Sequence, residues 1–208
     1  DGFEWIKDPR GMIGVRLEMF GHVFTGKKTI IHNIRKSIEK AGLVVAEMVI
    51  APLALTETIL SDGEKDFGTI VIDVGGGQTT TAVMHDKQLK FTHVNQEGGE
   101  FVTKDISTVL NTSFNNAEAL KINYGDAYPA RTSASEEFPV DVIGKSEPIK
   151  IDERYLSEII EARMEQIFNK SKEVLEEIFW VEDFRWEVII WSKFPSNFLI
   201  LISYFYLI

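Results

Sequence analysis

Residues 68–84 read GTIVIDVGGGQTTTAVM, and this stretch decides the fold of the chain. The β-branched run from Ile70 to Ile72 is typical of a strand buried on both faces, and it leads into Asp73. Glycines occupy positions 75–77, and threonine and valine follow them, so the chain is expected to leave the turn as a second strand. The pattern predicts a β-hairpin with a glycine turn. A dinucleotide-binding fingerprint or a P-loop would instead need a helix after the glycines.

The glycine turn favours the binding of an anion. Its backbone N–H groups have no Cβ beside them to block a close approach, so they could hold phosphate oxygens. Asp73 at the end of the strand could hold Mg²⁺ through water. The alternative is an ordinary glycine-rich hairpin turn, but the acid before the turn and the hydroxyl-rich strand after it favour a phosphate site.

DVGGGQTT at 73–80 resembles the second phosphate motif of the actin, Hsp70 and sugar-kinase superfamily. The surrounding chain resembles the bacterial cell-division family FtsA over about residues 1–178. The segments that carry this resemblance stand in the family's order and spacing: DPRGMIGVRLEM (8–19), TIIHNIRKSIEKAGL (29–43), APLALTETIL (51–60), QEGGEFVTKDI (96–106) and AEALKINYG (117–125). The resemblance implies an α/β fold of the actin-like (ribonuclease H-like) ATPase type, present in part.

The resemblance also implies a site for ATP and Mg²⁺. No catalytic residue is predicted, and the expected activity is at most that of a weak ATPase. Glu118 and Lys121 match the family's AE-x-x-K pattern near the adenosine, although a solvated ion pair between positions i and i+3 explains them equally well. The expected cofactor-binding residues are Asp73 (which also holds the metal through water), Gly75, Gly76, Gly77, Gln78, Thr79, Thr80, Gly98, Gly99, Glu118 and Lys121.

The longest predicted helix starts after Asp152, which caps it, and runs to about Ile178. In the family, this segment resembles the helical part of the subdomain that receives the C-terminal peptide of the tubulin-like protein FtsZ. Arg163, Ile167 and Lys170 share one helix face, and two cations around an isoleucine would suit an acidic and apolar peptide. The alternatives are cations screened by neighbouring carboxylates and ordinary core packing.

The predicted organisation has five parts. They are the end of the small FtsA-specific subdomain (1–27), part of the first actin-like half with an interdomain helix (28–66), the second half with the phosphate loop (67–125), an inserted subdomain with the FtsZ-binding helix (126–178), and a non-family tail (179–208). The elements expected within them are a half-buried strand with Ile13, Val15, Leu17 and Met19 on one face, helices at 29–41 and 52–60, a strand at 44–50, a loop at 61–68, a hairpin turn at 86–87, helices at 100–110 and 116–121 with Asn116 as the cap, and short strands within 139–144 and 148–151.

The last thirty residues, FWVEDFRWEVIIWSKFPSNFLILISYFYLI, differ in character from the rest. They show no sustained helical or alternating order, and neither the further strand nor the adenosine motif of the family is expected in them. We hypothesise a shift of reading frame near residue 178 that leaves an aggregation-prone tail. The alternative is a membrane anchor, although the apolar end from Phe198 is shorter than the ~20 residues of a spanning helix.

Composition limits the remaining possibilities. The net charge of −10 disfavours nucleic acid as a partner, and the absence of cysteine excludes disulfides.

The resemblance implies an ATP-binding cell-division protein that tethers FtsZ filaments to the membrane and polymerises with itself. It would be cytoplasmic, peripheral on the inner membrane face at the division site, and attached by a C-terminal helix that is absent here. The alternatives are a sugar-kinase-type phosphotransferase and a pure protein-interaction module.

Overall fold

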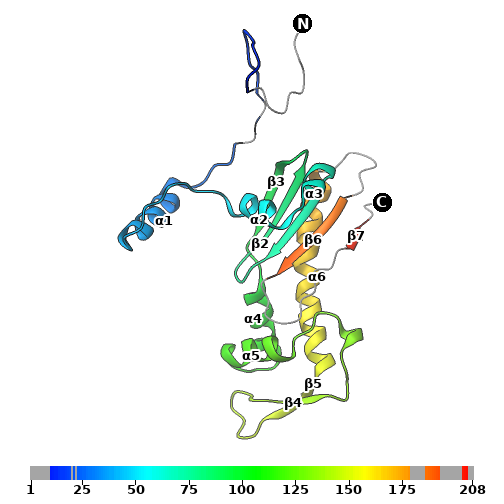
Figure 1. Ribbon diagram of the computed structural model, residues 1–208. Helices are drawn as coiled ribbons and strands as arrows, with labels where there is room; N and C mark the ends of the chain where they lie inside the picture. Colours follow the sequence, from blue (N-terminus) through cyan, green and yellow to red (C-terminus); the bar gives the residue numbers. More distant parts are fainter. Residues whose placement is uncertain (1–9, 20, 22, 179–185, 193–202, 206–208) are drawn as a thin grey trace. The chain divides into compact units, whose positions relative to one another are not determined.

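The computed structural model describes residues 10–19, 21, 23–178, 186–192 and 203–205, the last two segments as backbone only. The chain divides into two units, Asp1–Ala46 and Glu47–Ile208. The larger unit is built around a five-stranded sheet with the strand order β3-β2-β1-β6-β7 (Figure 1). Its strands are β1 (Thr69–Val74), β2 (Thr79–His85), β3 (Gln88–Asn95), β6 (Trp186–Ser192) and β7 (Ser203–Phe205).

The predicted hairpin around the glycines is confirmed. β1 and β2 are antiparallel, and Asp73 lies opposite Thr80 in their register. β3 continues the antiparallel order beyond β2, after a two-residue turn at Asp86 and Lys87. Both turn residues have positive φ, as a tight hairpin turn of this hand requires.

Helices cover both faces of the sheet. Ile70, Ile72 and Val74 of β1 face one core, and Val71 between them faces the other. This alternation follows from the two-residue period of a strand. The helices of the larger unit are α2 (Ala51–Ile59), α3 (Asp62–Phe67), α4 (Gly99–Val109), α5 (Phe114–Tyr124), the 3₁₀ turn η1 (Pro129–Arg131) and α6 (Glu153–Ile178). α2 packs on the smaller core, whereas α4, α5 and α6 surround the larger one.

α6 is the long element that connects the two ends of the larger unit (Figure 1). Its first residues follow a two-stranded sheet of β4 (Glu137–Val140) and β5 (Ile149–Asp152), and its later turns contact β3. The predicted cap is confirmed, because the Oδ1 of Asp152 accepts a hydrogen bond of 2.8 Å from the N–H of Tyr155. The short strands predicted within 139–144 and 148–151 are confirmed in part, at slightly different bounds.

Two predictions about helix starts were wrong. Residues 61–68, expected to be a loop, contain α3, and the S-x-x-E pattern of Ser61 and Glu64 forms a reciprocal capping box there. α5 is capped by Ser113, whose Oγ accepts a hydrogen bond from the N–H of Asn116. Asn116 therefore lies inside the first turn rather than at the cap.

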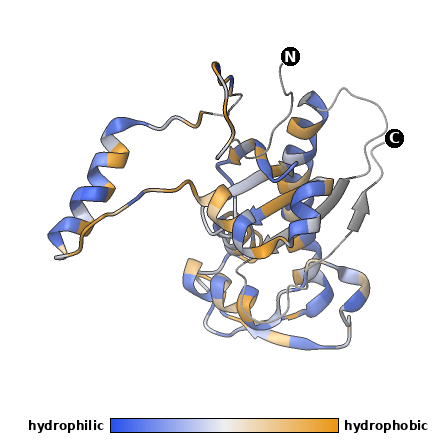
Figure 2. Ribbon diagram, turned by 45° about the horizontal axis from the view of Figure 1, so that its top comes forward, coloured by the Kyte–Doolittle hydropathy of each residue, from blue (hydrophilic) through white to orange (hydrophobic). Residues whose placement is uncertain are grey.

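The smaller unit contains α1 (Lys28–Lys40), on which hydrophilic and hydrophobic positions alternate (Figure 2). This helix confirms the prediction for 29–41. It ends in a Schellman motif at Gly42, where φ is 81°, the Gly42 N–H bonds Glu39 O and the Leu43 N–H bonds Ile38 O. Its isoleucines at 30, 31 and 34 are exposed to solvent among the described residues.

Two strands predicted from apolar patterns are absent from the described residues. The segment with Ile13, Val15, Leu17 and Met19 is irregular and these side chains are exposed, and residues 44–50 are likewise irregular. An alternating or apolar pattern fixes which side chains would share a face. A strand also needs a neighbour to accept its backbone hydrogen bonds, and the described residues pair no strand with either segment.

A further strand, which the sequence analysis did not expect, forms in the C-terminal segment. β6 lies parallel to β1, with Val188 opposite Ile70 and Ile190 opposite Ile72. The β-branched run WEVIIWS explains this strand by the same reasoning that applies to β1. The hypothesis of a shifted reading frame stays a prediction, since most of residues 179–208 lie outside the described part.

The core makes a first prediction. Ile106 of α4 is fully buried in the larger core, whereas Val109, one helical turn further on, is 50% exposed. Ile106→Ala should lower the free energy of unfolding by about 2–5 kcal/mol, because it leaves a cavity. Val109→Ala should change it by about 0.5 kcal/mol or less. Urea unfolding followed by circular dichroism measures both, and equal effects of the two substitutions would contradict this assignment of the core.

Candidate functional site

The glycine turn between β1 and β2 is closed by one hydrogen bond, from the Gly75 N–H to Gln78 O at 2.9 Å. Gly76, Gly77 and Gln78 are exposed, and among the described residues their N–H groups donate to no acceptor. None of the three glycines has a positive φ. A Cβ on Gly77 would meet no atom within 4 Å, so glycine leaves open space there instead of satisfying a backbone constraint.

The N-terminus of α4 docks onto this turn. The N–H of Gly99 donates to Gly75 O at 2.9 Å, and the N–H of Glu100 donates to Gly76 O at 2.8 Å. In a trans peptide the C=O of one residue and the N–H of the next point in opposite directions. Because both carbonyls point at α4, the N–H groups of Gly76 and Gly77 point away from it, toward the open side of the turn.

Gly98 makes this docking possible. A Cβ at this position would lie 2.4 Å from Gly75 O and 2.7 Å from Gly76 O, which is far inside any normal contact. Its φ of −158° is ordinary extended backbone, so the requirement for glycine here is spatial. The family resemblance predicted that Gly98 and Gly99 bind the nucleotide, and the structure places both of them against the glycine turn.

The two threonines after the turn are buried. The Thr79 Oγ1 donates to Glu97 O at 2.8 Å, so this hydroxyl is engaged inside the protein and does not face the open side of the turn. Thr80 lies opposite Asp73 on the neighbouring strand. Thr79 therefore supports the turn from inside the protein. Thr80 shares one face of the sheet with Asp73, and Gln78 is exposed.

Asp73 is the acidic residue at this end of β1, and it is partly buried. Burial raises the pKa of its carboxyl above the ordinary value of 3.8, because desolvation disfavours the charged form. No group of three or more potential ligand residues surrounds it or forms anywhere else in the described part of the chain. A single carboxylate suits a metal that keeps most of its water, as Mg²⁺ does.

Glu118 and Lys121 form the ion pair between positions i and i+3 that the alternative predicted, but only the glutamate, 38% exposed, reaches solvent, and the lysine is buried. The Lys121 side chain is only 7% exposed, and its Nζ lies 2.6 Å from Glu118 Oε2, 2.7 Å from Thr103 Oγ1 and 3.1 Å from Gly99 O. Burial alone raises the pKa of Glu118, but the hydrogen bonds from Lys121 and Thr103 and the charge of Lys121 outweigh it, so the pKa is lowered. This cluster ties α5 to the first turn of α4.

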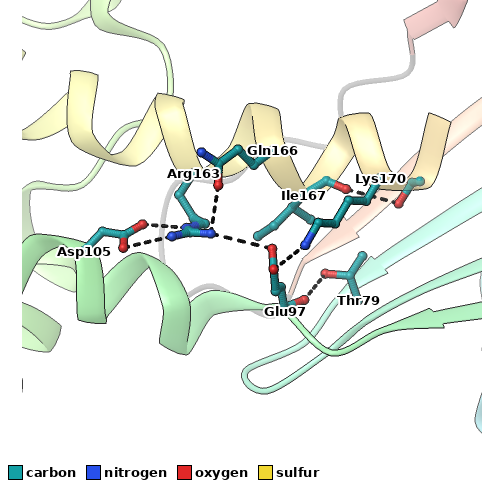
Figure 3. A network of polar contacts seen from close by, with 8 residues as sticks. Thr79, Glu97, Asp105, Arg163, Gln166, Ile167 and Lys170 are labelled. Atoms are coloured by element: carbon teal, nitrogen blue, oxygen red, sulfur yellow. Dashed lines mark hydrogen bonds and ion pairs between the residues drawn. The ribbon is translucent and has the colours of Figure 1, made fainter. Parts of the chain in front are cut away.

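Arg163 and Ile167 point into the molecule from α6 (Figure 3). The guanidinium of Arg163 donates to both carboxylate oxygens of Asp105 on α4, at 2.5 and 3.0 Å, and Ile167 is fully buried. Lys170 forms an ion pair with Glu97. The prediction of an open face with two cations around an isoleucine is therefore corrected, because both cations are engaged by internal carboxylates and the isoleucine is in the core.

Glu97, Asp105 and Thr103 were missed by the sequence analysis. Their partners lie far along the chain, 58 positions away for the pair of Asp105 and Arg163 and 73 for the pair of Glu97 and Lys170. No short motif encodes such contacts. The one available signal was the position of Glu97, directly before Gly98 and Gly99.

A family model for "Cell division protein FtsA" matches residues 70–193. The chain belongs to the FtsA family. It is 84% identical over 178 residues to the FtsA of Enterococcus faecalis, and 53% identical over 176 residues to that of Streptococcus pneumoniae. These matches cover 86% and 85% of this chain but only 40% and 38% of those relatives, so the chain spans about two fifths of their length.

Solved structures show that the chain has an actin-like ATPase fold, present in part. MreB5 of Spiroplasma citri bound to ADP superposes with a TM-score of 0.57 at 20% identity, over 73% of this chain and 49% of that one. A PilM–PilN type IV pilus biogenesis complex also gives 0.57, at 15% identity, over 79% of this chain and 40% of that one. The FtsA match extends past residue 178 and includes β6.

Gly98 provides a prediction about the turn. Gly98→Ala should lower the free energy of unfolding by about 1–3 kcal/mol, because the new methyl group collides with the carbonyls that bind α4. Gly77→Ala is the matched control, since its methyl group enters open space. Chemical denaturation of both variants is the measurement. A Gly98→Ala variant as stable as Gly77→Ala would show that α4 is not docked this way.

Asp73 provides a pH prediction. Since its pKa is raised in the folded state, ionised Asp73 destabilises the fold at pH values above that raised pKa, and the effect vanishes below the ordinary value of 3.8. Asp73→Asn should therefore increase the free energy of unfolding at pH 7. The difference from wild type should shrink as the pH falls toward 4. Urea midpoints measured across this range test it, and a stability difference that is independent of pH would contradict it.

Proposed function

We propose that this chain carries part of an ATP and Mg²⁺ site of an FtsA-family cell-division protein. The observation that supports this most is the pair of N–H groups at Gly76 and Gly77, which point away from α4 at an exposed turn and donate to no acceptor among the described residues. Successive backbone N–H groups of this kind bind phosphate oxygens well.

The residues around the turn have distinct proposed roles. Gly76, Gly77 and Gln78 donate to phosphate oxygens, and Asp73 holds the waters of a bound Mg²⁺. The metal would neutralise part of the phosphate charge. Gly98 and Gly99 hold the turn in its orientation. Glu118 and Lys121 are proposed to face the adenosine side, which is consistent with the contact between Lys121 and the carbonyl of Gly99.

The proposed cellular role extends the family assignment. The chain belongs to a protein that tethers FtsZ filaments to the cytoplasmic membrane at the division site and polymerises with copies of itself. It works on the inner face of that membrane, to which a C-terminal helix attaches it. In the residues that the structure describes, no helix is both long and apolar enough to cross a membrane. Because the chain spans about two fifths of its relatives' length, these properties are proposed for the longer protein.

A sugar-kinase-type phosphotransferase is the first alternative. Such an enzyme needs a carboxylate base beside the acceptor hydroxyl. Near the turn, the described residues place Asp73, the proposed metal ligand, and Glu100, whose Oε1 would lie 3.8 Å from a Cβ on Gly76. A phosphoryl-transfer assay with simple sugars distinguishes the two functions. A pure interaction module is the second alternative, and it predicts no affinity for nucleotide at all.

The test is equilibrium binding of a fluorescent ATP analogue with and without Mg²⁺. Asp73→Ala should remove the dependence on Mg²⁺ and weaken binding by at least about tenfold, and Gly77→Val should weaken binding whether or not Mg²⁺ is present. Asp141→Ala, which removes an exposed acid far along the chain from the turn, is the control. Equal affinity of Asp73→Ala and Asp141→Ala in Mg²⁺ would overturn the metal assignment, and no binding by the wild-type chain would favour the interaction module.

A further inference from the structure

We infer that Glu97 is a positioning residue for the glycine turn, held by Arg163 and Lys170 so that the turn and the long helix α6 are energetically coupled. The inference rests on the proposed function for its ligand, phosphate, but its structural part can be tested without one. Glu97 lies in the short connection between β3 and α4, and it contacts both Thr79, the first residue after the turn, and α6 (Figure 3).

The backbone of Glu97 is fixed to the turn from two directions. Its carbonyl accepts the 2.8 Å hydrogen bond from Thr79, the first residue after the turn. The next residue, Gly98, packs against the carbonyls of Gly75 and Gly76. A displacement of the Glu97 backbone would therefore disturb the entry into β2 and the docking of α4 together.

The side chain of Glu97 is fixed to α6. It is only 16% exposed, its Oε1 pairs with Lys170, and its Oε2 lies 3.6 Å from Nη1 of Arg163. Oε2 is buried and accepts no hydrogen bond within the described part of the chain, so its charge is balanced mainly by these two cations. In a poorly hydrated position, an uncompensated carboxylate is costly, so the pairing constrains where Glu97 can lie.

Arg163 is itself firmly held. Besides its two hydrogen bonds to Asp105, it donates to Gln166 at 2.9 Å, and its Cζ lies 5.6 Å from the centre of the Phe101 ring on α4. Its guanidinium is planar and keeps its charge, which makes it a rigid anchor. Glu97 therefore meets one fixed cation and one more flexible cation, both from α6.

The consequence is reciprocal coupling. α6 runs from the β4–β5 sheet to the neighbourhood of β3, so a change at its far end can reach Glu97 through Arg163 and Lys170. By linkage, a phosphate that orders the turn must stabilise the contacts of Glu97 with α6 to the same extent. The chemistry of this site thus connects anion binding at the turn to the position of a helix that extends well beyond it.

The first experiment measures amide hydrogen exchange at Gly99 and Glu100, whose N–H groups bond the turn's carbonyls. Glu97→Gln should speed exchange at both amides by about tenfold, since it removes the charge that fixes the connection. The matched control is Glu176→Gln, which removes the carboxylate of an exposed ion pair with Lys172 on α6. Exchange as slow in Glu97→Gln as in Glu176→Gln would overturn the inference.

Comparison with Asp105→Asn distinguishes positioning of the turn by Glu97 from a general contribution of Glu97 to stability. This substitution removes the main partner of Arg163 and should lower global stability, yet it leaves the pair of Glu97 and Lys170 intact. If the exchange rates at Gly99 and Glu100 follow only the global free energy of unfolding across all variants, Glu97 does not position the turn. Should Glu97→Gln fail to fold, Lys170→Gln, which removes a half-exposed partner, is measured in the same way with the same criterion.

The second experiment measures affinity for a fluorescent ATP analogue in Mg²⁺. Glu97→Gln should weaken binding by about tenfold, and adding Lys170→Gln should weaken it little further, because both substitutions break one contact. Additive losses would contradict the coupling. A wild-type chain that binds no analogue would overturn the proposed function, and the exchange experiment would then decide alone whether Glu97 positions the turn.

Discussion

The two hydrogen bonds from the N–H groups of Gly99 and Glu100 to the carbonyls of Gly75 and Gly76 are the constraint on which the site depends. A helix begins with N–H groups that have no partner inside the helix, and α4 satisfies two of them with the turn. The same bonds decide the direction of the turn's own peptides, since each carbonyl that faces α4 forces the following N–H to face the other way. The positive end of the α4 dipole also lies beside the turn, where it favours an anion even though its first N–H groups are engaged.

This arrangement needs close contact between two backbones, and close contact explains the glycines better than unusual dihedral angles do. Gly98 touches two carbonyls, so any side chain there would separate α4 from the turn. The internal polar groups around it then follow from the same geometry. Lys121 donates to the carbonyl of Gly99 at the start of α4 and is neutralised by Glu118, and Glu97 connects the segment before α4 to the cations of α6. Each of these charges is paired, as the low polarity of their surroundings requires.

The sequence predicted the elements whose signals are local. The hairpin of β1 and β2, the turn at Asp86 and Lys87 and the cap of α6 at Asp152 follow from β-branched runs, turn residues and capping chemistry. The predictions for 13–19 and 44–50 failed because strand formation depends on a partner that no local pattern reveals. α3 was missed although its S-x-x-E capping box was readable in the sequence. In the site, the glycine turn was predicted from its own residues, and Gly98, Gly99 and Lys121 were predicted through the family resemblance. The network of Glu97, Asp105 and Arg163 joins three distant segments and has no periodic or spaced signature.

The charge balance of the chain explains why backbone groups carry the proposed binding. With a net charge of −10, the protein repels a polyphosphate at long range, so local donors and a metal must supply the attraction. The cations around the turn do not supply it directly, because Lys121, Arg163 and Lys170 are all engaged by carboxylates. Their contribution is to hold the backbone that carries the N–H groups. Asp73 completes this division of roles, since its burial disfavours the free carboxylate and a bound cation would remove that penalty. The site is therefore expected to bind the metal and the phosphate together. The metal would balance the negative charges of Asp73 and of the phosphate, and the backbone N–H groups would bind the phosphate oxygens.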